Sequence, residues 1–453
     1  MNKGFVPLLL LAATSCLAQT PPIKPQTPDI KVPPPIVLPG PNDPNVVVGR
    51  QPLAVEEAVA IALQRQVTIR AARAGIEAAA GRTQQSKSDL LSQFSANAGI
   101  SDERRFRGQS GGAPNRFSAS VGVDQLLFDF GRTRTQVRQQ EALERVSRFA
   151  LERELQEVSL QTRLAYYNLV ESIQAVTVSD SNLASRQRQY ALAEARVESG
   201  LGSPADYVRA KTNLAESVLS LENARQSAIE DRVTLADQMG VDPRTPITPA
   251  ETPLQSLTTL PSSPDPALLN TFVEEALKQR PEMAEAQQRL VAAGLGVAVA
   301  KLSNAPSVNL SGNVSTRGSD DPFQTSTGTL GVFLSWRFID GGFTAGRTRE
   351  ARAQEEQAKA GLEDTSQLVI NEVSRNLAAA ISARNRVTLA EAQVANAREL
   401  VRISEGRYRG EIGQFLEISD AQSSLFSAER NLNQAISDAR RADARLQRAL
   451  GRK

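Results

Sequence analysis

The chain has 453 residues, with 52 Lys and Arg against 50 Asp and Glu. Its formal net charge of +2 provides no basic field for nucleic acid, and charge alone names no partner. Histidine is absent and Cys16 is the only cysteine, which excludes disulfides, zinc sites of the Cys/His type and serine–histidine triads. Because no phosphate loop or nucleophile elbow stands out either, we expect no enzyme activity and no cofactor.

Residues 1–18 have the layout of a secretory signal, with one lysine, an apolar stretch over residues 5–13 and small residues after it. We expect cleavage before Gln19, and lipidation of Cys16 in a degenerate lipoprotein box is the alternative. The mature protein is therefore expected to leave the cytoplasm. No later apolar segment approaches the ~20 residues that a spanning helix needs, so any membrane-embedded part is expected to consist of strands.

Two proline clusters divide the chain. Ten prolines between residues 20 and 44 predict an extended tether over residues 19–52, and seven more predict a linker over residues 241–266. The parts 53–240 and 267–453 resemble each other at a shift of 211 residues, which pairs Asp129 with Asp340. We interpret them as the first and second structural repeats of an internal duplication.

Each repeat predicts the same order of elements: a helix, two strands, a long helix and a second helix. Strands are expected at about 93–102, 116–127, 307–315 and 327–338, and the helices that follow them at 132–199, 204–239, 343–409 and 414–450. From Leu155 to Val197 a seam at seven-residue spacing runs too long for an ordinary globular helix. A two-stranded coiled coil is the alternative, but the alanine-rich face of 414–450 lets helices approach on more than one side and favours a wall of helices.

The four predicted strands alternate apolar and polar residues, and half of the 20 aromatic residues lie in or beside them. Such alternation over about ten residues is typical of membrane-spanning strands, and aromatic residues at strand ends suit the membrane interfaces. The polar segments 102–115 and 316–326 are expected to be outward hairpin loops. A half-buried sheet of a soluble protein is the alternative.

Four strands cannot close a barrel, because about eight are needed and open edges are not tolerated in hydrocarbon. The membrane part must then be shared between chains. Three chains would give twelve strands and four would give sixteen, and the strand arithmetic does not choose between them. A ring of long helices joined to such a barrel would be a conduit.

A family resemblance rests on segments spread from Leu53 to Gly451. They are the opening LAVEEAVAIALQRQ, LAYYNL at 164–169, LFDFGRT and FIDGGFTAGR after the hairpins, and the turns RVESGLGSPADYVRAKTNL and RYRGEIGQFLEISDAQSSL. In order and duplication these segments resemble the TolC-like outer-membrane efflux family (outer membrane factors). The resemblance implies an α+β membrane protein: a long antiparallel α-helical barrel continuous with a transmembrane β-barrel, four strands per chain, closed by homotrimerisation.

The same resemblance implies a location in the outer membrane with an extension into the periplasm, and partners that include a periplasmic adaptor and an inner-membrane pump. It implies that the turns joining the long helices dock the adaptor. Here those tip turns hold Gly200, Leu201, Gly202 and Ser203, and Gly410 and Gly413, with one more residue between Gly410 and Ala421 than between Gly200 and Ala210.

The resemblance also places a periplasmic aperture at these turns, lined by Asp206, Tyr408, Glu417 and Asp420. The basic residue that often follows the second tip glycine in the family is missing here. In a ring of chains Glu417 and Asp420 would form circles of like charge, which attract cations in a narrow pore. Ordinary solvated positions on a coiled coil are the alternative for these acids.

The function expected is a passive exit duct for small molecules in a tripartite efflux system. Protein export in a one-step (type I) secretion system uses the same architecture and is the first alternative. A periplasmic coiled-coil protein without a channel is the second, and it should lack the two alternating hairpins.

Overall fold

The computed structural model describes residues 52–101, 116–250, 263, 265–318, 325–410 and 412–452. The expected signal peptide with Cys16, the tether up to residue 51, the loop 102–115 and residues 319–324 of the second loop lie outside the described residues. So does the stretch 251–262 of the linker. Expectations about these segments stay predictions.

Both parts of the chain have the same order of elements. The first contains α2 (Val55–Arg65), α3 (Val67–Ser88), β1 (Gln93–Ser101), β2 (Arg116–Phe128), α4 (Arg132–Glu198) and α5 (Pro204–Gln238). The second contains α6 (Pro266–Gln279), α7 (Pro281–Lys301), the short 3-10 helix η2 (Leu302–Asn304), β3 (Ser307–Gly318), β4 (Thr325–Ser335), α8 (Phe343–Arg409) and α9 (Phe415–Ala449). With 67 residues each, α4 and α8 extend for about 100 Å at ~1.5 Å per residue.

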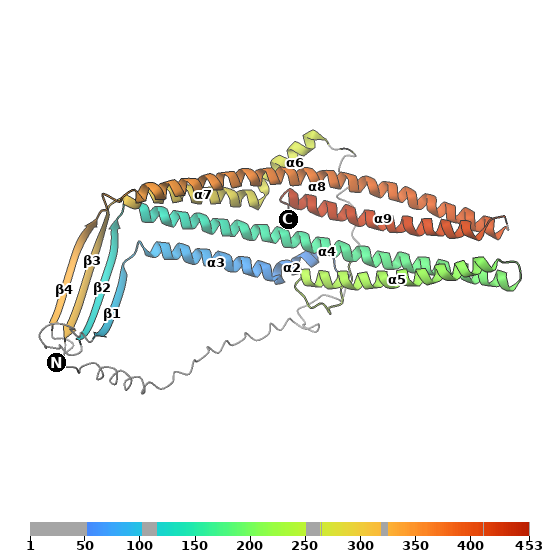
Figure 1. Ribbon diagram of the computed structural model, residues 1–453, viewed down its shortest axis with the longest axis horizontal. Coiled ribbons are helices and arrows are strands. Elements are labelled where there is room, and N and C mark those ends of the chain that lie inside the picture. Colours follow the sequence, from blue (N-terminus) through green and yellow to red (C-terminus); the bar gives the residue numbers. More distant parts are fainter. Residues whose placement is uncertain are drawn as a thin grey trace, which may run out of the picture. The chain divides into compact units, whose positions relative to one another are not determined.

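Shorter helices pack along the length of the long helices α4 and α8 (Figure 1). Next to the strands, α3 packs on α4, and α7 packs between α4 and α8. Toward the other end, near the turns that join α4 to α5 and α8 to α9, α5 packs on α4, and α9 packs between α4 and α8. The helices therefore form a layer in which α3 and α5 lie at one edge and α8 at the other. The alanine-rich face of α9 packs against the neighbouring helices, because Ala421, Ala428, Ala435, Ala439, Ala442 and Ala449 are all buried.

The single helix expected at the start of each repeat is wrong, because the structure has two. Gln66 separates α2 from α3 and Arg280 separates α6 from α7, and both residues have extended backbone with ψ near 130°. Arg280 precedes Pro281, whose ring disfavours the helical conformation in the residue before it. At Gln66 the side chain instead accepts a hydrogen bond from the backbone N–H of Val67 and caps the new helix.

The strands form one antiparallel sheet in the order β1-β2-β3-β4, so β1 and β4 are its free edges. The register places apolar residues opposite one another: Phe94 opposite Val123, Ala96 opposite Val121, and Val121 opposite Val314. Directly paired residues share a face of the sheet, so one face is apolar across all four strands. Ser, Asn, Thr and Asp side chains occupy most of the other face.

The last strand is shorter than expected, since β4 ends at Ser335 and Trp336 and Phe338 follow it. Ser335 pairs with Ser307, and the residue before Ser307 is Pro306, which has no N–H to extend the ladder. Trp336 and Phe338 contact each other with ring centroids 6.0 Å apart, just before α8 begins.

A buried cluster surrounds the first residues of the described chain. Leu53 pairs with Pro249, and both the Leu53 and Ala250 carbonyl oxygens lie 2.8 Å from the hydroxyl of Tyr166, which is fully buried. Val241 and Ile247 are buried in the same cluster. The first ten residues of the expected linker are thus packed against α2 and α4 rather than extended away from them.

Candidate functional site at the helical hairpin turns

The turn between α4 and α5 is specified by its glycines. Gly200 has a positive φ of 73°, and the backbone N–H groups of Leu201 and Gly202 both donate to the carbonyl of Arg196. A Cβ on Gly202 would lie 2.8 Å from the backbone nitrogen of Val197, so a side chain does not fit there. Ser203 then caps α5. The side chain of Leu201 is left at the summit of the turn, 77% exposed.

The turn between α8 and α9 repeats this arrangement. The N–H groups of Ile412 and Gly413 both donate to the carbonyl of Arg407, and a Cβ on Gly413 would lie 3.0 Å from the side chain of Arg407. Ile412 is 74% exposed at the summit, like Leu201. These bonds match Leu201 with Ile412 and Gly202 with Gly413 at the constant shift of 211, so the one-residue difference counted between the two turns is not an insertion. Pairing Gly200 with Gly410 had produced it.

Tyr408 does not extend freely from its turn, because it is buried between the two hairpins. Its ring packs on Phe415, in a cluster with Ala193, Ala210 and Ile418. The guanidinium of Arg196 lies over the Tyr408 ring, and its Nη2 donates to the Tyr408 carbonyl. Arg196 was missed in the sequence; the only signal for it is that Arg407 occupies the equivalent position before the second turn.

The three predicted acids lie near the turns but not together. Glu417 forms an ion pair with Arg407, with 3.3 Å between Oε2 and Nε, and both side chains are about half exposed. The basic residue expected after the second tip glycine is missing, but Arg407, which lies before the second turn, supplies a cation in this region. Asp206 lies in the first turn of α5, where a carboxylate favours the positive end of the helix. Asp420 is exposed one turn beyond Glu417, and neither Asp206 nor Asp420 has an ion pair within the described part of the chain.

A tyrosine pair joins α4 and α5 below the first turn. The hydroxyls of Tyr190 and Tyr207 lie 3.1 Å apart, and Tyr190 also donates to the carboxylate of Glu194. The hydrogen bonds with Tyr207 and then with Glu194 raise the pKa of Tyr190, because both favour the protonated phenol.

Further from the turns a polar layer ties α9 to the first hairpin. Arg186 is 6% exposed, and it donates to the hydroxyl of Ser423 at 2.8 Å and to Gln189. Burial lowers the pKa of Arg186. Asn213 on α5 donates to Ser419 on α9. The two hairpins are thus joined by polar bridges here and by Arg196 at the turns.

Within the described ranges no cluster of three His, Cys, Asp or Glu residues has the arrangement of a metal site. None of the described helices combines the length and the apolar character that crossing a membrane requires.

Comparison with known proteins gives one consistent result. The family model for "Outer membrane efflux protein" matches residues 58–241 and 272–452. The outer membrane efflux protein BepC of Brucella suis is 26% identical over 403 residues, which is 86% of this chain and 84% of that protein. The probable efflux pump outer membrane protein TtgC of Pseudomonas putida is 25% identical over 84% of this chain and 79% of its own length.

Solved structures of outer membrane channels share the fold. The open-state structure of the MtrE outer membrane channel of Neisseria gonorrhoeae superposes with a TM-score of 0.76, covering 88% of this chain and 89% of that chain at 21% identity. At this level of identity the likeness shows the fold alone.

Proposed function

The chain belongs to the outer membrane efflux protein family, and from this premise we propose that it is the outer-membrane exit duct of a tripartite efflux system, passing small molecules passively to the exterior. Proteins of this family are efflux channels of the outer membrane and not enzymes. The proposal adds three particulars: a homotrimer with a twelve-strand barrel, an adaptor that docks on the hairpin turns, and an aperture at those turns.

The observation that carries the proposal is the apolar face of the sheet. Its large side chains are exposed rather than covered by helices, for example Phe94, Ile100, Leu330 and Leu334, each at least 69% exposed. A face of this kind is unfavourable in water and favourable against lipid chains, and the polar face opposite suits a water-filled lumen.

Closure by copies of the same chain is supported by the free edges. The sheet ends at β1 and β4, and unpaired strand edges are not tolerated in hydrocarbon. Exposed apolar residues also recur along the free sides of the edge helices, at Val208, Leu219, Ile229 and Val233 on α5 and at Leu368, Leu389, Leu400 and Ile403 on α8. We infer that α5 and β1 of one chain meet α8 and β4 of the next, which closes a ring of three internally duplicated chains.

The turns offer a surface for the adaptor. Leu201 and Ile412 are apolar, highly exposed and held at equivalent positions by the same backbone bonds. In a trimer they would form six apolar points around one end of the duct. We propose that the periplasmic adaptor packs on these six points, with Gly200, Gly202 and Ser203 and with Gly410 and Gly413 shaping the turns, and that the adaptor connects the duct to an inner-membrane pump.

For the aperture we propose that Asp206, Glu417 and Asp420 of three chains surround the axis while Tyr408 packs behind them. Three copies of Glu417 and Asp420, one helical turn apart, would concentrate cations at the entrance. Because Glu417 is paired with Arg407 in each chain, Asp420 is the acid expected to dominate.

Planar-bilayer recording of the purified full-length oligomer tests the proposal. We expect stable conductance, and block by hexaamminecobalt(III) added on the turn side only. Combining Glu417→Ala with Asp420→Ala should remove the block, whereas Glu405→Ala, an exposed acid paired with Arg409 on α8, should not. A water-soluble monomer without conductance would refute the duct, and unchanged block in the double variant would refute the aperture alone.

A further inference from the structure

The polar face of the sheet carries two isolated charges. Among the strand residues whose side chains the structure describes, Asp124 on β2 and Arg317 on β3 are the only charged ones, and both are exposed. Asp124 is paired with Ser311 in the register, and Arg317 lies six residues beyond Ser311 on the same strand. Because side chains alternate between the faces of a strand, an even spacing puts both charges on the same face.

The two charges lie at different levels of the sheet. Six residues at ~3.4 Å per residue separate them by about 20 Å. Strand β2 runs toward α4, which puts Asp124 on the side of the helices (Figure 1). Arg317 is paired with Thr325, the first residue of β4, so it lies toward the opposite end. The polar face therefore has an acid near the helices and a base near the hairpin loops.

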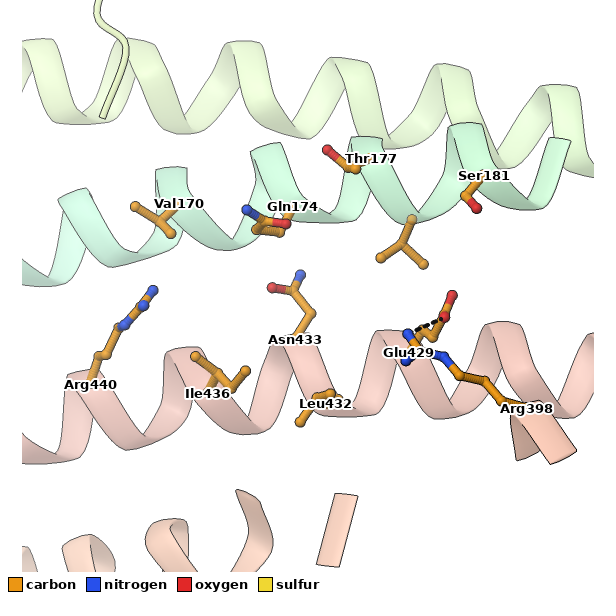
Figure 2. Close-up of a pocket in the computed structure, with 11 residues that line it drawn as sticks. Val170, Gln174, Thr177, Ser181, Arg398, Glu429, Leu432, Asn433, Ile436 and Arg440 are labelled. Carbon is orange, nitrogen blue, oxygen red and sulfur yellow. Dashed lines mark hydrogen bonds and ion pairs between the residues drawn. The ribbon is translucent and has the colours of Figure 1, made fainter. Parts of the chain in front are cut away.

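Neither charge is neutralised by a neighbouring group of the described chain. Many charged groups of the helices do pair, as Arg398 and Glu429 do at 3.1 Å beside the cavity shown in Figure 2. Asp124 instead accepts a hydrogen bond from the neutral hydroxyl of Ser311 at 2.7 Å. Within the described residues neither Asp124 nor Arg317 takes part in an ion pair.

The sequence of the hairpin segments leaves the charge of Arg317 in excess at its end of the sheet. Segments 102–116 and 319–324 together contain four acidic and four basic residues, so their formal charges cancel. The net formal charge at this end is therefore that of Arg317.

Closure of the barrel would turn each charge into a ring. This step rests on the proposed function, in which the polar faces of three chains line one lumen. Twelve strands ~4.8 Å apart and tilted by ~40° give a circumference of about 75 Å and a backbone radius of about 12 Å. Charged groups that project from this wall lie within about 10 Å of the axis, which is the screening length in ~0.1 M salt. The field of each ring therefore reaches the axis, whereas the separation along the strands keeps the two rings independent.

We propose that the lumen of the barrel is a bipolar charge filter, with three Asp124 carboxylates toward the helices and three Arg317 guanidinium groups toward the exterior. The outer ring attracts anionic groups and repels cations that approach from outside, and the inner ring does the reverse. The molecules favoured in the outer part of the lumen are therefore those that carry a carboxylate, phosphate or sulfonate group.

The test uses thiol reagents of opposite charge on the purified full-length oligomer. Ser118→Cys places a thiol directly opposite Arg317, and Ser95→Cys places one diagonal to Asp124; both serines are exposed. The reagents are the anionic sulfonatoethyl and the cationic trimethylammonioethyl methanethiosulfonates. Each rate is divided by the rate of the same reagent with a small free thiol. Mass spectrometry of the modified peptide measures the reaction, so that Cys16 does not interfere.

In ~0.1 M salt we expect the anionic reagent to be favoured about fourfold at Ser118→Cys and the cationic reagent about fourfold at Ser95→Cys, as a unit charge about 7 Å away requires. In ~1 M salt both preferences should nearly vanish, because the screening length falls to about 3 Å. Arg317→Gln should remove the preference at position 118 alone, and Arg317→Lys should keep it. Asp124→Asn should remove the preference at position 95 alone.

The outcomes separate the filter from the duct. If both cysteines react without a charge preference, or if Arg317→Gln leaves the preference at position 118 unchanged, the filter is overturned and the duct stands. If neither cysteine reacts with either reagent, the polar face does not line a water-filled lumen, and the proposed barrel fails together with the filter.

Discussion

The guanidinium carbon of Arg196 lies 4.1 Å from the centroid of the Tyr408 ring, and Arg196 Nη2 lies 3.2 Å from the Tyr408 carbonyl oxygen to which it donates. Arg196 is in the last turn of α4 and Tyr408 is in the last turn of α8. One side chain thus joins the first helical hairpin to the second next to the turns. Because separation of the hairpins would break both interactions, Arg196 favours the closely packed arrangement described here.

Replacing Arg196 tests this effect on the proposed aperture. A cation–π contact contributes about 0.5–2 kcal/mol, so Arg196→Ala should raise the open probability in planar bilayers about twofold to thirtyfold. Arg196→Lys keeps the charge but stacks less well and should be intermediate. Arg188→Ala is the matched control, since Arg188 is exposed on α4 and, among the described residues, donates to Ser185 of the same helix. If Arg196→Ala and Arg188→Ala have the same open probability, Arg196 has no role in holding the two helical hairpins together at the turns.

Gly202 should be the least replaceable residue of the first turn. In Gly202→Ala the new Cβ would lie 2.8–2.9 Å from backbone atoms of Val197 and Arg196, and such overpacking costs about 1–3 kcal/mol. We expect faster limited proteolysis within residues 199–203 and a lower unfolding temperature. Gly410→Ala is the control, because Gly410 has an ordinary φ of −81° and its nearest neighbour would be 3.4 Å from the Cβ. Equal effects of the two substitutions would contradict the argument.

Regular patterns in the sequence predicted the elements well, whereas contacts between distant residues escaped it. The predicted helix 343–409 coincides with α8, and the predicted helix 132–199 ends one residue beyond α4, because glycines and long apolar seams mark those ends locally. The break at Gln66 has no proline or glycine to signal it. In the structure the Gln66 backbone is extended, and the Gln66 side chain turns back to cap α3.

The turns show the same limit at the level of single residues. Glycine is required at Gly200 by a positive φ and at Gly202 by the closeness of the backbone of Val197, and a sequence does not distinguish these reasons. Pairing the wrong glycines led to an apparent insertion. Arg196 and Tyr408 are 212 residues apart, so no local pattern could place one on the other.

Acid should weaken the attachment of α7 to α9 through Glu282. Its Oε1 accepts from Arg280 at 3.0 Å and from Arg448 at 2.8 Å. Burial alone would raise the pKa of Glu282, but the hydrogen bonds from Arg280 and the charges of Arg280 and Arg448 outweigh it and lower the pKa below the usual 4.5. Since the folded pKa is below the unfolded one, this stabilisation is present above about pH 4.5 and is lost as the pH falls through the folded pKa.

The measurement is the free energy of unfolding of the wild type and of Glu282→Gln between pH 7 and pH 3. We expect the wild type to be more stable at pH 7 and the difference to shrink as the pH falls below about 4.5. Glu274→Gln, on an exposed position of α6, should follow the wild type throughout. A difference that stays constant down to pH 3 would show that the carboxylate charge of Glu282 contributes nothing.

The two faces of the sheet should respond oppositely to a charge. Val121 on β2 lies between Ala96 of β1 and Val314 of β3, on the apolar face, while Ser120 lies between Asn97 and Ser315 on the polar face. An arginine facing lipid near the middle of a membrane costs about 2–4 kcal/mol, whereas one facing a lumen changes selectivity instead. Val121→Arg should therefore reduce the amount of protein recovered in outer membranes, and Ser120→Arg should be recovered normally but shift the ion preference of the conductance toward anions. The two substitutions differ by one position in one strand, so strand propensity and expression are matched between them. Equal recovery of both variants would mean that lipid does not cover the apolar face, and the proposed barrel would then have to be abandoned.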